Sequence, residues 1–179
     1  MINFRQIVQM FETIADKHIM IKSFHTGMLD EVDINKINTK DYVILYLEPQ
    51  GVIIDTGVMT YSFTIYTLDI INNNINTEPV LGDATLETFK ERKGRLDAYT
   101  DNLLILKDVI NEFKQNGTDE SWAQMPQNKT WLPVFLETPI NAEPFSARFD
   151  NLLTGWSATL SIQVDNENNL CDVPVEAND

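Results

Sequence analysis

The sequence is short of cysteine, histidine and glycine, and each shortage excludes a kind of protein. Of its 179 residues one is a cysteine, Cys171, so no disulfide can form within the chain. Cys171 lies in a polar, acidic stretch without the basic neighbours that activate a catalytic thiol. The 7 glycines are scattered singly and form neither common phosphate-binding loop. A disulfide-stapled domain and the common nucleotide-binding loops are therefore excluded.

Positive charge is also scarce. Lys and Arg total 13 against 27 Asp and Glu, which gives a formal net charge of −14 and a pI near 4.4. A negative field of this size repels phosphate backbones and anionic membrane surfaces, so a sequence-reading nucleic-acid binder is disfavoured. No apolar run approaches the ~18 to 20 residues that span a bilayer, and no basic stretch precedes an apolar one at the start. We expect a soluble protein without the usual export signal or a membrane partner.

Groups that could carry out catalysis or bind a metal do not converge in the sequence. The 2 histidines, His18 and His25, would face opposite sides of an extended segment. Asp97 and Asp101 stand one helical turn apart, a spacing that can bind a hard cation but more often forms a solvated face. The basic cluster 90–95 has two interpretations, a solvated helix face or a contact with an acidic partner. We expect no catalytic residue, no metal and no cofactor.

The first half of the chain predicts one helix and then strands. Apolar residues at three- and four-residue spacing predict a helix over 3–16, with Asn3 and Gln6 as a capping box and Met10 off the centre of the apolar stripe. A β-branched segment from Ile19 to Phe24 predicts a strand, and the polar stretch 26–41 predicts a loop long enough to be functional.

Two longer strands are predicted next. The apolar run within 41–48 suits a strand buried on both faces that ends at Pro49-Gln50-Gly51. Residues 58–70 alternate, with Met59, Tyr61, Phe63 and Ile65 on one face. Residues 52–54 would be the partner strand across a turn at 55–57, so an antiparallel hairpin is expected.

The second half predicts helices, then strands. Helical spacing runs from Leu81 to Lys114 with a possible interruption at Gly94, and a polar connection follows over 117–130. Strands are predicted at 131–138 and 145–149, and the clearest alternation in the chain covers 156–164.

These elements define an α+β fold: an antiparallel β-sheet packed against an N-terminal helix and long central helices. Residues 1–165 would form a single domain and 166–179 an acidic C-terminal tail. The predicted core places three side chains of the last strand against residues of the helices, and the full set is Trp156, Leu160, Ile162, Phe4, Phe11, Leu103, Leu106 and Phe113.

The order of these elements resembles that of the neck and tail-completion (tail-terminator-like) ring proteins of tailed bacteriophages, over roughly residues 1–165. The asparagine run at 72–74 suits a phage of an AT-rich gut bacterium, such as the crAss-like group. The segments that carry the resemblance are Ile14-Ala15-Asp16-Lys17-His18, Ser23-Phe24-His25-Thr26-Gly27, Asp41 to Pro49, Phe63 to Asp69, Asp101 to Ile110, and Asn151 to Leu160.

The resemblance implies a virion structural protein without catalytic residues. Its partners would be other copies of itself in a ring of ~6 to 12 subunits, the neighbouring portal, neck and tail proteins, and DNA that passes without sequence-specific contact. The expected location is the virion neck or tail, with the host cytoplasm as the site of assembly. An acidic ring would let DNA slide through its channel where a basic ring would grip it.

Candidate contact residues lie in the polar connection, because a tryptophan outside the core is a common interface anchor. We expect Trp122 and Trp131 to anchor contacts between subunits or rings, with Asp119 and Lys129 on a polar rim. The alternative function is a small acidic monomeric inhibitor, an immunity-type or DNA-mimic protein. The two functions differ in self-association, since a ring subunit must bury two different surfaces and an inhibitor need bury neither.

Overall fold

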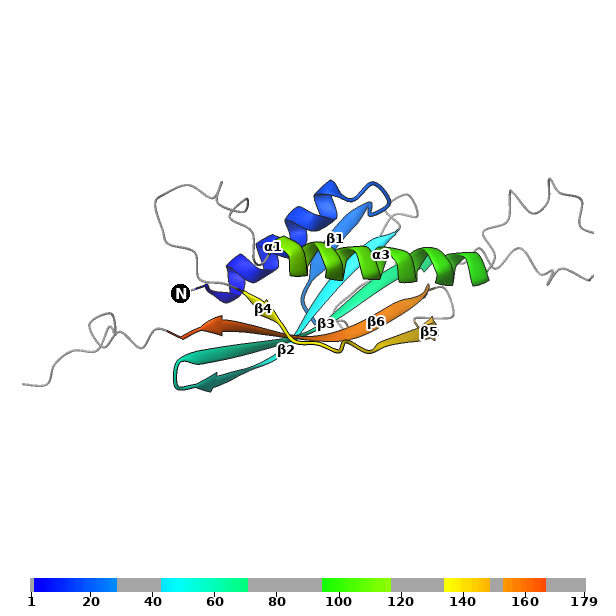
Figure 1. Ribbon diagram of the computed structural model, residues 1–179. Helices are drawn as coiled ribbons and strands as arrows, with labels where there is room; N and C mark the ends of the chain where they lie inside the picture. Colours follow the sequence, from blue (N-terminus) through cyan, green and yellow to red (C-terminus); the bar gives the residue numbers. More distant parts are fainter. Residues whose placement is uncertain (1, 29–42, 71–94, 117–133, 149–152, 167–179) are drawn as a thin grey trace, which may run out of the picture.

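The computed structural model describes residues 2–28, 43–70, 95–116, 134–148 and 153–166 (Figure 1). These residues form a six-stranded sheet with two helices on one face, so the α+β expectation is confirmed. The elements in chain order are α1 (Phe4–Lys17), β1 (Ser23–Thr26), β2 (Ile44–Asp55), β3 (Val58–Ile70), α3 (Arg95–Asn116), β4 (Phe135–Leu136), β5 (Ala142–Arg148) and β6 (Leu153–Asp165).

Helix α1 begins and ends close to its predicted bounds. Asn3 is the N-cap: its side chain accepts a hydrogen bond from the Gln6 backbone N–H at 3.0 Å, and the Gln6 side chain accepts one from the Asn3 N–H at 2.9 Å. The predicted capping box is therefore confirmed. Two details differ, because Met10 is buried within the apolar stripe, whereas Phe4 at the start of the helix is 41% exposed.

The cap provides a test of how much local sequence stabilises α1. Replacing Asn3 with alanine removes the side-chain acceptor for the Gln6 N–H and keeps the backbone N–H that donates to Gln6, and we expect a loss of about 1 kcal/mol in the free energy of unfolding. Asn3→Asp, which keeps an acceptor oxygen, should lose less than half of that. Urea denaturation of the three proteins measures the difference. Equal stability of all three would show that the cap contributes nothing.

The sheet order is β1-β2-β3-β6-β4, with β5 also paired to β6. Strand β1 is parallel to β2, so the expected purely antiparallel sheet is wrong and the sheet is mixed. The reason is the path after α1: a turn at residues 19–20 places β1 four residues later than the start of the predicted strand and beside Ile44–Leu47. Such a parallel neighbour leaves no local pattern in the sequence.

Strand β2 continues through the residues predicted to end it. Its pairing with β3 runs from Ile44 to Asp55, with a shift of register between Pro49 and Gly51. A bulge of this kind admits the extra residue and accommodates a proline, which has no N–H to donate. The hairpin turn at residues 56–57 and the full extent of β3 are confirmed.

The main core lies between the sheet and the two helices. Leu160 and Ile162 of β6, Phe11 of α1, and Leu106 and Phe113 of α3 are buried, as predicted. The rings of Phe11 and Phe113 stack with their centroids 4.4 Å apart. The remaining predicted core residues are less enclosed: Trp156 is partly buried, and Leu103 is 38% exposed. Burial also raises the pKa of the Tyr61 phenol, which lies beside Phe4.

One helix, α3, occupies the described part of the region where long central helices were predicted. The part of that prediction from Leu81 to Gly94 lies outside the described residues. Hydrogen bonds fix α3 on the sheet: Trp156 Nε1 donates to the Tyr99 carbonyl at 2.8 Å, and Thr67 Oγ1 donates to the Asn102 carbonyl at 3.2 Å. Neither of the helices in the described ranges combines the length and apolar character needed to cross a bilayer.

The opposite face of the sheet carries a second, smaller cluster at one end only. Ile44, Tyr46, Tyr66 and Leu68 are buried there. The ring of Phe145 packs edge-on to that of Tyr66, with the ring centroids 6.0 Å apart. The Tyr66 hydroxyl donates to Glu48 at 2.8 Å. Both faces of β2 are thus buried over Ile44–Leu47, which confirms the prediction of a strand enclosed on both sides.

Candidate assembly interface

The far end of the β2–β3 hairpin exposes apolar side chains on both of its faces. Val52 is 44% exposed, Ile53 64%, Ile54 73% and Val58 37%, whereas Leu45 and Leu47 in the same β2 strand are fully buried. In Figure 1 the hairpin end lies clear of both helices. Contiguous exposed apolar side chains of this kind mark interaction surfaces. We call residues 51–58 the hairpin tip.

The hairpin tip has a defined turn and is held by the end of β6. Gly57 adopts φ +83°, a conformation that favours glycine, and the Thr56 N–H donates to Asp55 Oδ1 at 2.6 Å. Asn166 then bonds the turn twice, since its backbone N–H donates to the Gly57 carbonyl at 3.0 Å and its Nδ2 to the Asp55 carbonyl at 3.0 Å. The exposed apolar residues are therefore presented on an ordered strand pair.

One edge of the sheet is open at the hairpin tip. Strand β1 pairs with β2 only over Ile44–Leu47, and in the described ranges no strand pairs with that side of β2 from Gly51 to Asp55. Residues 51–55 are all exposed. Alternate residues of such a strand direct N–H and C=O groups outward, where they can pair with another chain.

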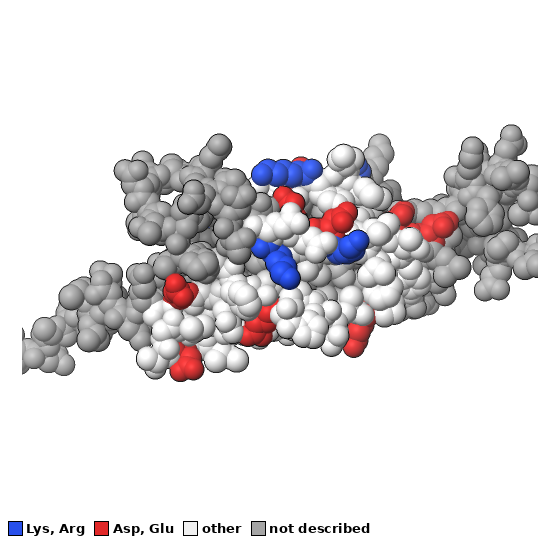
Figure 2. Space-filling view, viewed as in Figure 1, with Lys and Arg blue, Asp and Glu red and all other residues white. Residues whose placement is uncertain are grey.

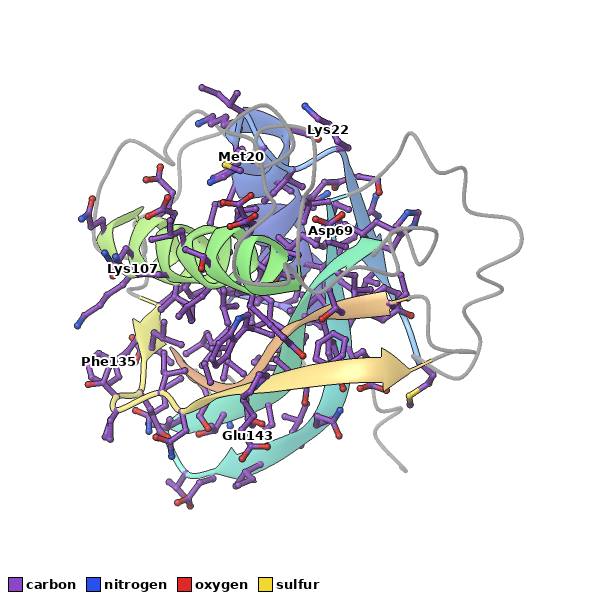
Figure 3. All side chains as sticks on the ribbon, turned by 90° about the vertical axis from the view of Figure 1, so that its right-hand side faces the viewer. Met20, Lys22, Asp69, Lys107, Phe135 and Glu143 are labelled. Atoms are coloured by element: carbon purple, nitrogen blue, oxygen red, sulfur yellow. The ribbon has the colours of Figure 1, made fainter. Side chains whose placement is uncertain are left out.

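The opposite edge of the sheet also lacks a described partner strand at the end that carries the hairpin tip. Strands β4 and β5 both pair with β6, and no other described strand lies beyond them. Phe135 of β4 is 60% exposed and projects at this edge, as Figure 3 shows. Further along the edge, β5 contains Pro144, which cannot donate a backbone hydrogen bond and discourages pairing there. The region around Phe135 is the part of this edge that remains suited to pairing.

The two exposed edges are the ends of a single cross-strand row. Ile53 pairs with Thr60, Thr60 with Gln163, and Gln163 with Phe135. Directly opposed residues in a sheet point to the same face, so Ile53 and Phe135 both lie on the face away from the helices. The side chains between them are polar and half-exposed.

Charge borders this row without interrupting it. Two rows further toward the turn, on the same face, lie Asp55, Val58 and Asp165, and the Gln163 side chain donates to Glu137 on the other side. Figure 2 shows acidic side chains spread singly over the visible face, with uncharged surface between them at the hairpin end. An apolar contact with a polar rim is the usual composition of a protein interface.

The interface residues proposed from sequence cannot be compared with this surface. Trp122, Trp131, Asp119 and Lys129 all lie outside the described residues, as do most of the loop 26–41 and the acidic tail from residue 167. Sequence reasoning in turn missed Ile53 and Phe135. The available signal was the triplet Val52-Ile53-Ile54, which places apolar residues on both faces of a hairpin next to its turn.

The two histidines occupy separate structural roles. His18 is the C-cap residue of α1; its Nδ1 accepts a hydrogen bond from the Met20 N–H at 3.2 Å, and its Nε2 lies 3.8 Å from Asp108 of α3. His25 lies exposed in β1. Asp97 and Asp101 are on α3, and within the described part of the chain no three His, Cys, Asp or Glu side chains are placed to hold a metal ion.

Comparison with known proteins assigns no family: no protein-family model and no curated protein matches this chain. A function is therefore proposed from the sequence and from the geometry of the sheet edges.

Proposed function

We propose that this protein is a non-enzymatic virion structural protein that forms an oligomeric ring in the neck or tail of a tailed bacteriophage. The observation that carries the proposal is the exposed apolar hairpin tip on a sheet edge with which no strand of the described ranges pairs. Soluble proteins normally protect such edges with charge, proline or a covering element, and an unprotected one invites pairing with another chain. The order of elements that resembles phage ring proteins gives the assembly its proposed setting.

The overall charge fits a channel through which DNA moves. A net charge of −14 per subunit becomes a strong negative field when several copies surround one axis. Such a field keeps a phosphate backbone from adhering to the wall, so DNA can pass without sequence-specific contact. The ring would meet portal, neck or tail proteins above and below it.

Copy number in purified particles tests this function. Quantitative mass spectrometry should find the chain in mature particles at ~6 to 12 copies, the number expected for a single closed ring. A monomeric peak from gel filtration of the isolated subunit does not bear on this result, because such subunits can assemble only on a preformed template. Absence from particles, together with a soluble complex of one copy with one basic partner, would favour the inhibitor instead.

A further inference from the structure

We infer that the ring contact is a head-to-tail continuation of the β-sheet, in which the β2 edge at Ile53 of one copy pairs with the β4 edge at Phe135 of the next. The inference rests on the proposed ring and names the surface that builds it. Each of the two edges binds another copy of this chain.

The two edges lie in the same cross-strand row, and each carries an exposed apolar side chain. Ile53 and Phe135 end the same cross-strand row and lie on the same face, with exposed fractions of 64% and 60%. Placing a second copy beside the first, in register with this row, sets Ile53 of one copy against Phe135 of the other. The contact would remove both side chains from water and pair the outward backbone groups of β2 next to Ile53 with those of the two-residue strand β4.

Strand direction is also compatible. Strands β2 and β3 are antiparallel, as are β3 and β6, and β6 and β4. Strand β4 therefore runs opposite to β2, and the β4 edge of one copy meets the β2 edge of the next as an antiparallel pair. The alternating pattern continues across the subunit boundary with no change of direction.

Away from this row, β1 covers β2 at Ile44–Leu47, and Pro144 removes one backbone donor from β5. Pairing of the outer side of β2 is thereby confined to the end of the sheet that carries the hairpin tip. A contact that joins two different edges repeats from copy to copy and closes into a ring when the rotation per copy allows it.

A symmetric contact between two β2 edges is the competing geometry. It would bring Ile53 of both copies together, leave Phe135 exposed, and end at a dimer. The two geometries therefore differ in which residue lies opposite Ile53.

Thiol cross-linking separates them. In a Cys171→Ser background of the full chain, Ile53→Cys and Phe135→Cys are made as single variants, one of them tagged, and as a double variant. Three strand spacings of about 4.8 Å separate the two positions within one subunit, so a disulfide between them cannot form internally. Ile19→Cys is the matched control, because Ile19 is an exposed isoleucine, 89% accessible, in the turn after α1.

Concentrated mixtures of the two single variants are then oxidised and analysed by mass. We expect Ile53–Phe135 heterodimers in about 10-fold or greater excess over the Ile19–Phe135 control, since docked thiols have an effective concentration in the millimolar range. The double variant should give a ladder of covalent oligomers. A yield equal to the control, or a predominance of Ile53–Ile53 dimers, would overturn the inference. If particles still contain ~6 to 12 copies in that case, the ring stands and uses another surface; if they contain none, the proposed function fails as well.

Discussion

Replacing Gly155 with alanine is expected to cost about 3 kcal/mol or more, a large part of the roughly 5 to 15 kcal/mol by which a domain is stable. Gly155 lies in β6 where β3 passes very close: a Cβ at this position would be 1.7 Å from the Thr67 carbonyl oxygen and 3.3 Å from Phe145 Cζ. The first of these is a backbone atom within a paired strand, so the clash can be relieved only by moving the sheet.

Gly51→Ala is the matched control. Gly51 also lies in a strand, but a Cβ there meets no atom within 4 Å. Its replacement should leave stability unchanged or raise it by up to ~1 kcal/mol, because alanine restricts the unfolded chain. Chemical denaturation of the two variants gives both values. A stable Gly155→Ala protein would show that β3 and β6 are not packed as described.

Leu106→Ala is expected to lower the free energy of unfolding by ~2 to 5 kcal/mol, because Leu106 is 1% exposed in the core between α3 and the sheet. Leu104→Ala tests the same chemical change in the same helix at a position that is 49% exposed, and it should cost about 0.5 kcal/mol or less. Both variants change helix propensity equally, so the difference between their free energies of unfolding reports the effect of burial.

Urea denaturation monitored by tryptophan fluorescence and by circular dichroism measures both variants. Equal effects would mean that α3 does not present Leu106 to the sheet. A large loss at Leu104 with little at Leu106 would mean that the helix is rotated about its axis.

Elements encoded by local patterns could be predicted from the sequence. The capping box at Asn3 and Gln6 placed the start of α1, because both groups lie within one turn of the helix. The alternation over residues 58–70 gave the correct face for Phe63 and Ile65, since the side-chain period of a strand is fixed. The turn at residues 56–57 followed from Asp-Thr-Gly between two apolar segments.

Features that depend on distant contacts could not be predicted. The parallel pairing of β1 with β2 depends on how the chain leaves α1, and nothing within residues 19–26 distinguishes it. Pro49 ends many strands, but the bulge before Gly51 lets this one continue. Leu103 fits the helical spacing as well as Leu106 does, and only the packing of α3 in the fold decides that Leu106 is buried while Leu103 is 38% exposed.

The candidate interface also depends on distant contacts and could not be predicted from local sequence. Sequence reasoning chose tryptophans in a polar stretch, whereas Ile53 and Phe135 are exposed because they lie on the face of the sheet away from the helices. An isoleucine in a hairpin is typical of a core, and its burial depends on what covers the strand. No local pattern encodes that cover.

The most direct test of the ring is a cryo-EM reconstruction of the head–tail junction of particles that carry this chain. The account predicts a closed ring around the DNA channel in which each subunit shows two helices on one face of a six-stranded sheet. A fully interpreted junction, neck and tail in which no density matches this chain would contradict the account.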